Sequence, residues 1–284
     1  MAQEIWSNTD FPHQCLIDIA RTDAFKNAIE EVVRPGDVVL DVGSGSGILS
    51  FLASRKTPSR IVAVELDPLL ARCLRTSVER NGLTEVIDVV EGNALDIKKE
   101  NFPSKVDVVL AEIVDTGLMD EQLVPVLNRL WREGIIDAST RIIPNSYQTR
   151  MQLVNVGTEF YGYDITAPQH LWPHYTVEGA GWWQTELRSL SAEIEVVRLD
   201  FTKGPSELSV DKILTFRQEN AGVANGVKIC GTLELSESLT LGATNALNGD
   251  KFIPIDFIKS GSEIRLRVKY NHGGGLNSLQ IEEL

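Results

Sequence analysis

Two glutamates nine residues apart, Glu112 and Glu121, are the side chains whose type and spacing best suit chemistry in this chain of 284 residues. Glu112 ends a β-branched run at residues 106–112, and Glu121 begins a predicted helix at residues 121–131. Two carboxylates in one pocket repel each other unless a cation joins them. Guanidinium suits such a pair because it is planar and presents a fork of donors. The pair therefore predicts a site for a guanidino group.

A glycine-rich loop is the strongest local signal. The β-branched run at residues 37–42 leads into Gly43, Gly45 and Gly47, and a helix is predicted to follow. Glycines let the backbone approach a ligand closely, and a helix N-terminus then lies beside it. The GxGxG pattern differs from the GxGxxG of nicotinamide enzymes, which points away from a dinucleotide. Asp41 precedes the loop, and it either contacts the ligand or only orients the loop.

Acidic and amide side chains follow the next two predicted strands. Glu65 ends the second strand, where its carboxylate can accept both hydroxyls of a ribose. Asn93 and Ala94 follow the third strand, where a side chain and the backbone can meet an adenine edge. With the glycine loop, this ordered set resembles the class I S-adenosylmethionine-dependent methyltransferases. The resemblance implies S-adenosyl-L-methionine as cofactor and S-adenosyl-L-homocysteine as product.

Strand and helix signals alternate over the first half of the chain, which predicts a parallel sheet covered on both faces. The pattern changes near Pro144 to short alternating runs separated by Gly, Asn, Asp and Ser, which favour an antiparallel sandwich or barrel. We therefore expect two domains, residues 1–144 and 145–284. Strands are expected at 37–42, 61–65, 86–90, 106–112, 150–156, 192–201, 210–217, 226–235, 252–258 and 263–270, and helices at 47–54, 68–81 and 121–131.

The segment from Glu112 to Glu121 resembles the double-glutamate loop of the protein arginine methyltransferases. Its residues are more similar to those of the monomethylating branch of that family. Asp18-Ile19-Ala20-Arg21-Thr22 is similar to the Asp-x-x-Arg-Thr helix of that family. The resemblance covers nearly the whole chain. It implies an α/β fold, with a Rossmann-like parallel-sheet methyltransferase domain followed by an antiparallel β-barrel domain. It also implies that Glu112, Glu121 and Asp18 form the catalytic set and that Arg21 holds the carboxylate of the cofactor.

One family feature is missing from the sequence. In the family, a Thr-His-Trp loop late in the barrel closes the arginine pocket, and its His pairs with the residue corresponding to Asp18. The matching stretch here, Asn248 to Pro254, contains neither His nor Trp, and His13 is interpreted as a surface residue and not as a substitute base. The substrate therefore stays open between arginine in a protein or peptide and free arginine or another small guanidino compound. A third hypothesis is a cofactor-binding scaffold without catalysis.

Composition narrows the classes of partner. Forty acidic against 27 basic residues give a net charge of −13, which is a poor surface for nucleic acid. No apolar run reaches the roughly 18 residues of a membrane helix, and the first residues lack the pattern of a secretory signal, so we expect a cytoplasmic protein with no membrane partner. Three widely spaced cysteines, Cys15, Cys73 and Cys230, do not suggest a disulfide framework or a metal site, and they are predicted to be buried.

Residues 161–190 hold six of the ten Trp and Tyr residues and show no periodicity that would bury these rings in a core of their own. A patch of this kind needs a partner, and self-complementary pairing is the commonest way to cover it. In the resembled family the corresponding arm reaches the nucleotide-binding domain of a second subunit. We therefore predict a homodimer whose contacts include Trp172, Tyr175 and Trp182.

Overall fold

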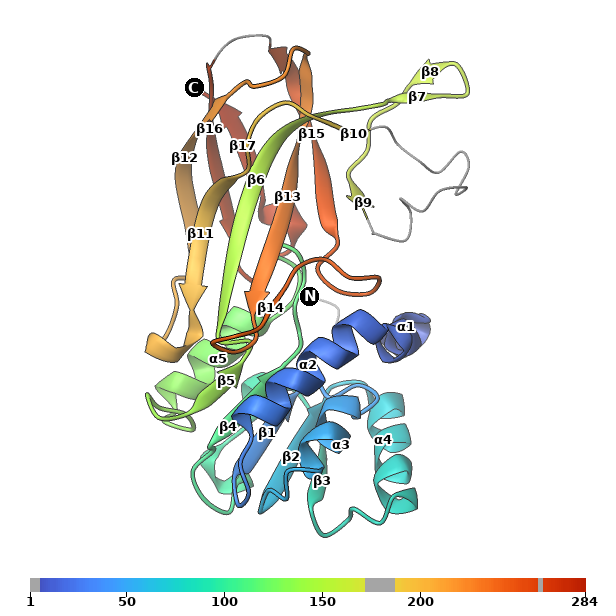
Figure 1. Ribbon diagram of the computed structural model, residues 1–284, viewed down its shortest axis with the longest axis vertical. Coiled ribbons are helices and arrows are strands. Elements are labelled where there is room, and N and C mark those ends of the chain that lie inside the picture. Colours follow the sequence, from blue (N-terminus) through green and yellow to red (C-terminus); the bar gives the residue numbers. More distant parts are fainter. Residues whose placement is uncertain (1–5, 172–186, 260–262) are drawn as a thin grey trace.

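The computed structural model describes residues 6–171, 187–259 and 263–284. Figure 1 shows a smaller helix-covered sheet at one end of the molecule and long antiparallel strands at the other. The chain crosses from one to the other once, between residues 143 and 146.

The N-terminal sheet has five parallel strands in the order β3-β2-β1-β4-β5. All residues of β1 and β4 are buried, so both faces of the sheet are covered there, as predicted. The strand order reverses between β1 and β4, and open α/β sheets bind ligands outside the carboxyl ends of strands at such a point. The strands are β1 (Val38–Val42), β2 (Arg60–Glu65), β3 (Ile87–Glu91), β4 (Val108–Ala111) and β5 (Arg141–Ile143).

Local signals explain where the helices around this sheet begin. The carboxylates of Asp18 and Asp67 cap helices α2 and α4, and Pro68 stands at the first position of α4. Helix α5 buries an apolar stripe that includes Leu123 and Leu127. The helices are α1 (Phe11–Ile17), α2 (Ile19–Val32), α3 (Ile48–Ser54), α4 (Pro68–Arg80) and α5 (Leu123–Arg132), with 3-10 turns η1 (Trp6–Asn8), η2 (Ala94–Asp96) and η3 (Lys99–Asn101).

The C-terminal half is an antiparallel β-barrel made of two sheets, as predicted. Strand β6 is central, because it pairs with β13 on one edge and with β10 and β11 on the other, while β16 pairs with β12 and β17. Apolar side chains of both sheets fill the space between them. The strands are β6 (Ser146–Val156), β9 (Gln169–Leu171), β10 (Leu187–Ser189), β11 (Ile194–Asp200), β12 (Ser209–Arg217), β13 (Ala224–Glu234), β14 (Thr240–Leu241), β15 (Asp250–Lys259), β16 (Glu263–Asn271) and β17 (Gln280–Glu283), with turns η6 (Phe201–Lys203) and η7 (Leu276–Ser278).

The two halves share one apolar core. Tyr147, Leu233 and Leu247 from the barrel belong to the same cluster of buried residues as the strands of the parallel sheet. Such a shared core fixes the barrel against the carboxyl ends of β1 and β4, where the candidate site lies.

A short hairpin projects from the barrel (Figure 1). It consists of β7 (Glu159–Phe160) and β8 (Tyr163–Asp164), and its Tyr161 is 90% exposed. Trp172, Tyr175 and Trp182, the predicted dimer contacts, lie outside the described residues. Among the described residues, no helix is both long and apolar enough to cross a membrane.

The prediction that all three cysteines are buried is wrong for Cys73. Cys230 is buried and Cys15 is partly buried, but Cys73 is exposed on α4. Helix α4 places Ala71, Leu74 and Val78 against the core, so the residue between Arg72 and Leu74 turns toward solvent.

Candidate active site

The glycine loop joins β1 to α3 and lies at the switch point of the sheet. Gly43, Gly45 and Gly47 have φ values of 67°, 53° and 80°, in the left-handed region that favours glycine. A Cβ atom on Gly43 would lie 2.3 Å from Cγ2 of Ile113, which follows β4. The loop after β1 and the loop that carries Glu112 are therefore in direct contact.

Glu65, at the end of β2, binds the backbone of this loop. One carboxylate oxygen accepts a hydrogen bond from the amide of Gly45 at 2.6 Å, and the other accepts from the amide of Asp67 at 2.8 Å. Burial raises the pKa of Glu65, and these backbone donors hold back part of the rise. The structure thus places the carboxylate expected to bind ribose beside the glycine loop.

Asp41 is buried under the loop. Its carboxylate accepts a hydrogen bond from the hydroxyl of Ser50 at 2.6 Å, and its backbone carbonyl accepts one from the hydroxyl of Ser44 at 3.0 Å. Burial raises the pKa of Asp41 to about 6. These contacts join the loop to the first turn of α3, which favours the orienting role for Asp41.

Asn93 and Ala94 lie at the carboxyl end of β3, at the same edge of the sheet. The side-chain oxygen of Asn93 accepts a hydrogen bond from the amide of Leu95 at 2.9 Å and so caps η2. The amide of Gly92 donates to the carbonyl of Glu65 at 2.9 Å. The pair of predicted residues therefore directly follows a residue that is bound to Glu65, and both are half-buried.

Arg21 and Glu112 form an ion pair in the interior, with guanidinium and carboxylate in direct contact. Arg21 also donates to the carbonyl of Cys15 at 3.1 Å, and its Nε atom is buried without a hydrogen-bond partner. Burial alone would lower the pKa of Arg21, but the Glu112 carboxylate more than offsets this, so the pKa is raised and the group stays charged. The residue expected to bind the cofactor carboxylate thus contacts one of the paired glutamates.

Glu121 lies in the turn before α5, two residues earlier than the start of that helix. Asp115 shapes this turn, since its two carboxylate oxygens accept hydrogen bonds from the amides of Glu121 at 3.0 Å and Met119 at 3.2 Å. The helix begins at Leu123 and not at Glu121, as the sequence had suggested, because Asp115 binds the Glu121 amide in a turn outside the helix.

The carboxylates converge on Cys15. Burial raises the pKa of the Cys15 thiol to about 12, and the negative charges of Glu112, Glu121 and Asp18 add to the rise. These groups come from the end of α1, the start of α2 and the two ends of the double-glutamate loop. The three residues that the sequence predicted to act in catalysis are therefore all near enough to Cys15 to affect its pKa.

Asp18 has partners from both halves of the chain. One oxygen accepts a hydrogen bond from the amide of Arg21 at 3.1 Å, which caps α2, and the other accepts from the amide of Ala246 at 2.8 Å. Asp18, which the resemblance would pair with a histidine, is therefore bound here by a backbone amide of the barrel. His13 is exposed, as the sequence suggested.

Sequence reasoning missed Lys251. This residue on β15 is buried and forms ion pairs with Asp115 and Asp120 of the double-glutamate loop. A lysine directly before the apolar pair Phe252-Ile253 near the start of β15 is a signal that could have suggested a buried partner. Among the described residues, no group of three His, Cys, Asp or Glu side chains is placed to hold a metal ion.

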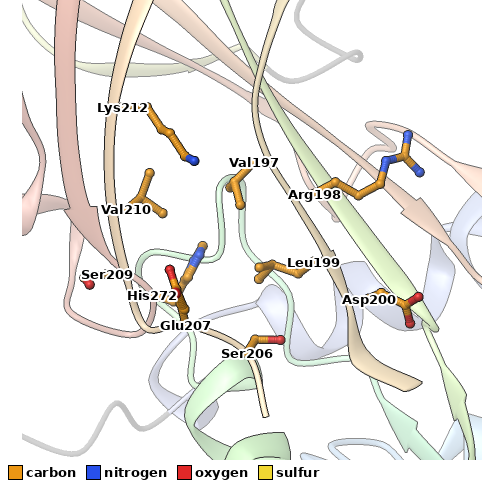
Figure 2. A pocket seen from close by; sticks show the side chains of 10 residues that line it. All are labelled: Val197, Arg198, Leu199, Asp200, Ser206, Glu207, Ser209, Val210, Lys212 and His272. Carbon is orange, nitrogen blue, oxygen red and sulfur yellow. The ribbon is translucent and has the colours of Figure 1, made fainter. Parts of the chain in front are cut away.

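A separate cavity of about 290 Å³ lies in the barrel between β11 and β12 (Figure 2). His272 and Leu199 line its buried side, and Glu207 and Lys212 lie at its exposed side. None of the predicted site residues lines this cavity. It is therefore distinct from the site at the switch point.

Comparisons with known sequences agree with this geometry. The family model of ribosomal protein L11 methyltransferase (PrmA) matches residues 22–157. An uncharacterized protein of Methanocaldococcus jannaschii is 30% identical over 272 residues, which cover 95% of each chain. An arginine N(omega)-methyltransferase of Streptomyces achromogenes subsp. streptozoticus is 27% identical over 277 residues, covering 90% of this chain and 74% of the relative.

Solved structures share the whole fold. The Trypanosoma brucei PRMT1 enzyme-prozyme heterotetrameric complex with AdoHcy matches with a TM-score of 0.69 and 15% identity, covering 97% of this chain and 98% of the other. Arabidopsis thaliana protein arginine methyltransferase 10 matches with a TM-score of 0.70 and 16% identity, covering 96% and 95%. The resemblance inferred from the double-glutamate loop is therefore confirmed for the fold.

Proposed function

Because the chain belongs to one family with the Methanocaldococcus jannaschii protein and shares the fold of the protein arginine methyltransferases, we propose that it methylates a guanidino nitrogen of arginine, with S-adenosyl-L-methionine as methyl donor. One observation supports this activity above all. Glu112 and Glu121 flank a loop at the switch point of the sheet, and their charges converge with that of Asp18 beside a buried arginine.

The residues present fit this cofactor. The buried Nε atom of Arg21 has no hydrogen-bond partner, which suits a guanidinium that receives the carboxylate of the amino-acid part. Glu65 would accept the ribose hydroxyls, and Asn93 with Ala94 would meet the adenine edge. The Cβ position of Gly45 is open, so the loop backbone can approach a ligand there, whereas the Cβ positions of Gly43 and Gly47 face Ile113 and Leu74. When bound, the cofactor supplies an electrophilic methyl group on its sulfonium and becomes S-adenosyl-L-homocysteine.

The paired glutamates compensate for the weak nucleophilicity of the substrate guanidinium. A guanidinium is protonated at neutral pH and its lone pairs are delocalised. Glu112 and Glu121 draw the positive charge toward the nitrogens they bind and orient the third nitrogen toward the methyl group, and such positioning can lower a barrier by roughly 7–11 kcal/mol. We assign proton acceptance to Glu121, because the carboxylate of Glu112 is already bound by Arg21.

We propose arginine in a protein or peptide as the substrate, in line with the names of the structural relatives. One observation favours a second candidate, free arginine or a small guanidino compound. Asp18 is bound by a backbone amide of the barrel where the family has a histidine, so the wall of the pocket differs on the substrate side.

Incubation with methyl-labelled S-adenosyl-L-methionine tests the activity. One reaction contains an arginine-rich histone-like peptide, a second contains free arginine, and a control contains the same peptide with every arginine replaced by lysine. We expect label in the arginine peptide alone. Label in free arginine alone would select the small substrate, and binding of S-adenosyl-L-homocysteine without transfer to either would reject the enzyme in favour of a scaffold.

We also propose a homodimer. Exposed apolar side chains gather at two places that lie far apart in the sequence, the α1–α2 junction and the β7–β8 hairpin. A two-fold axis can place the hairpin of one subunit on the α1–α2 junction of the other. Ile19 is 75% exposed and Tyr163 is 69% exposed, although both are large and apolar. The two sets are Leu16, Ile17 and Ile19 at the junction, and Phe160, Tyr161 and Tyr163 on the hairpin.

The domains are proposed as residues 1–144 and 145–284. The last strand of the parallel sheet ends at Ile143, and the first long strand of the barrel begins at Ser146. Since the halves share one apolar core, we do not expect either to fold alone. A cytoplasmic location without nucleic-acid or membrane partners stays a prediction from composition.

A further inference from the structure

Lys251 is 1% exposed, although a lysine is among the residues least often buried. Its ammonium nitrogen lies 2.9 Å from a carboxylate oxygen of Asp115 and 2.7 Å from one of Asp120. Burial alone would lower the pKa of Lys251, but the two carboxylates outweigh this and raise it, so the ammonium is charged. A buried charge persists only when it is paired in this way.

Both aspartates also accept hydrogen bonds from the backbone, Asp115 within the turn before α5 and Asp120 from turn η7 of the barrel. Asp115 accepts the amides of Met119 and Glu121, and the second oxygen of Asp120 accepts the amide of Leu276 at 2.7 Å. Lys251 is therefore connected to the backbone of Glu121 through a single side chain. The network fixes the Glu121 end of the double-glutamate loop to the barrel.

Neighbours of Lys251 hold the middle of the same loop. The hydroxyl of Thr116 donates to the carbonyl of Gly249 at 2.5 Å. The hydroxyl of Tyr147 accepts from the amide of Gly117 at 2.9 Å and donates to the side chain of Asn248 at 2.6 Å. The stretch that lacks the His and Trp of the resembled family thus contacts the loop at several successive points.

The positive charge of Lys251 also reduces the repulsion among the carboxylates of the double-glutamate loop. Four carboxylates occur between residues 112 and 121, and Arg21 pairs with only one of them, Glu112. Lys251 offsets the charges of Asp115 and Asp120, so these do not repel the carboxylate of Glu121 at full strength.

We propose that Lys251 is a positioning residue for methyl transfer, which acts through Asp115 and Asp120 to hold Glu121 in the place where it binds the substrate guanidinium. This inference rests on the proposed arginine methylation. It gives the stretch Asn248 to Pro254, which lacks the Thr-His-Trp loop, a different role, in which an ammonium bound to two aspartates supports Glu121.

The test compares Lys251→Met with Lys228→Met in the full-length protein. Lys228, on the neighbouring strand β13, is a matched control because it also forms ion pairs with two acids, Glu193 and Asp250, and both of these lie outside residues 112–121. We expect Lys251→Met to lower kcat at least tenfold and to raise KM for the arginine substrate. The dissociation constant of S-adenosyl-L-homocysteine, measured by calorimetry, should stay within about twofold. Lys228→Met should leave all three values within about twofold.

Two further variants separate positioning from loss of folding. Lys251→Arg keeps the charge and should recover most of kcat. If Lys251→Met does not fold, the variant with Lys251→Met, Asp115→Asn and Asp120→Asn removes all three charges and keeps one acceptor oxygen at each of positions 115 and 120. It should bind S-adenosyl-L-homocysteine normally and show the same loss of kcat. Wild-type kcat and KM in a folded Lys251→Met or triple variant would overturn the proposal, whereas an inactive wild-type protein would instead refute the proposed methylation.

Discussion

The guanidinium of Arg21 and the carboxylate of Glu112 form a buried ion pair between α2 and the loop after β4, across 91 residues of sequence. Arg21 is the proposed ligand of the cofactor carboxylate, and Glu112 is a proposed ligand of the substrate guanidinium. The two binding sites therefore meet at one pair of side chains, and substitutions on either side should be separable by their effects on cofactor affinity and turnover.

Glu112→Gln and Glu121→Gln should each leave the affinity for S-adenosyl-L-homocysteine nearly intact and lower turnover by orders of magnitude. The reason is that a neutral amide does not stabilise the guanidinium or its transition state. Calorimetry and steady-state kinetics measure the two effects, with Glu133→Gln at the exposed end of α5 as control. Retention of more than about half of the wild-type turnover in either variant would refute the clamp.

Arg21→Ala and Glu65→Ala should weaken cofactor binding. Each removes a charge-assisted hydrogen bond, which is typically worth roughly 1.5–3 kcal/mol, or about a 10-fold to 150-fold rise in the dissociation constant. Arg60→Ala, which breaks an ion pair with Asp88 at the protein surface, serves as control. Unchanged affinity in both test variants would contradict the assignment of the cofactor site.

Asp18→Asn should separate the two contacts of this side chain. The amide keeps an oxygen that can cap α2, but it cannot accept from both Arg21 and Ala246. We expect a small loss of stability, about 1 kcal/mol, together with a larger fall in turnover, because the barrel wall of the pocket loses its link to α2. Asp18→Ala should cost a further 0.5–2 kcal/mol, roughly the value of an N-cap. Thermal unfolding and kinetics of both variants test this, and equal stability of the two would argue against the capping role.

Asp41 should make stability depend on pH. Burial raises its folded-state pKa to about 6, whereas an unfolded aspartate has a pKa of about 3.9. The folded state therefore binds the proton more tightly, so this contribution to stability is complete below pH 3.9, roughly the unfolded pKa, and is lost as pH rises through about 6. Relative to Asp41→Asn, the wild-type protein should lose about 3 kcal/mol of its free energy of unfolding over this range.

Urea unfolding of both proteins at several pH values from 4 to 7.5 measures this difference. Ser50→Ala removes the hydrogen bond that lowers the pKa of Asp41, so it should shift the loss to higher pH. Curves for wild type and Asp41→Asn that run parallel over the whole range would show that Asp41 does not titrate there.

The hairpin should support dimer formation. Light scattering at micromolar concentration is expected to give twice the 31.4 kDa of one chain. The variant with Tyr161→Ser and Tyr163→Ser should shift the mass toward the monomer, because it removes apolar area from the proposed contact. Ile213→Ser, at a 55% exposed position on β12, should have no effect. A wild-type mass near that of a single chain would rule the dimer out.

Much of the fold follows from local patterns in the sequence. The β-branched runs, the glycine loop and the proline at the start of residues 68–81 predict strands β1 to β4 and helices α3 and α4 within one or two residues, because these signals act between near neighbours. The short strands β5 and β17 carry no such pattern, since they are stabilised by pairing with β4 and β16. Exposure of Cys73 was missed because the face of α4 that meets the core depends on how the helix packs.

The residue types of the site were also readable from the sequence, since the positions of Gly43, Glu65 and Glu112 after successive strands bring them to one edge of a parallel sheet. The side chains and amides that these site residues bind could not be read from the sequence. Arg21 with Glu112, Asp18 with the Ala246 amide, and Lys251 with Asp115 and Asp120 join segments 91 to 228 residues apart. These contacts exist because a shared apolar core places the barrel against the carboxyl edge of the sheet. That arrangement depends on packing between distant surfaces, which no local pattern records.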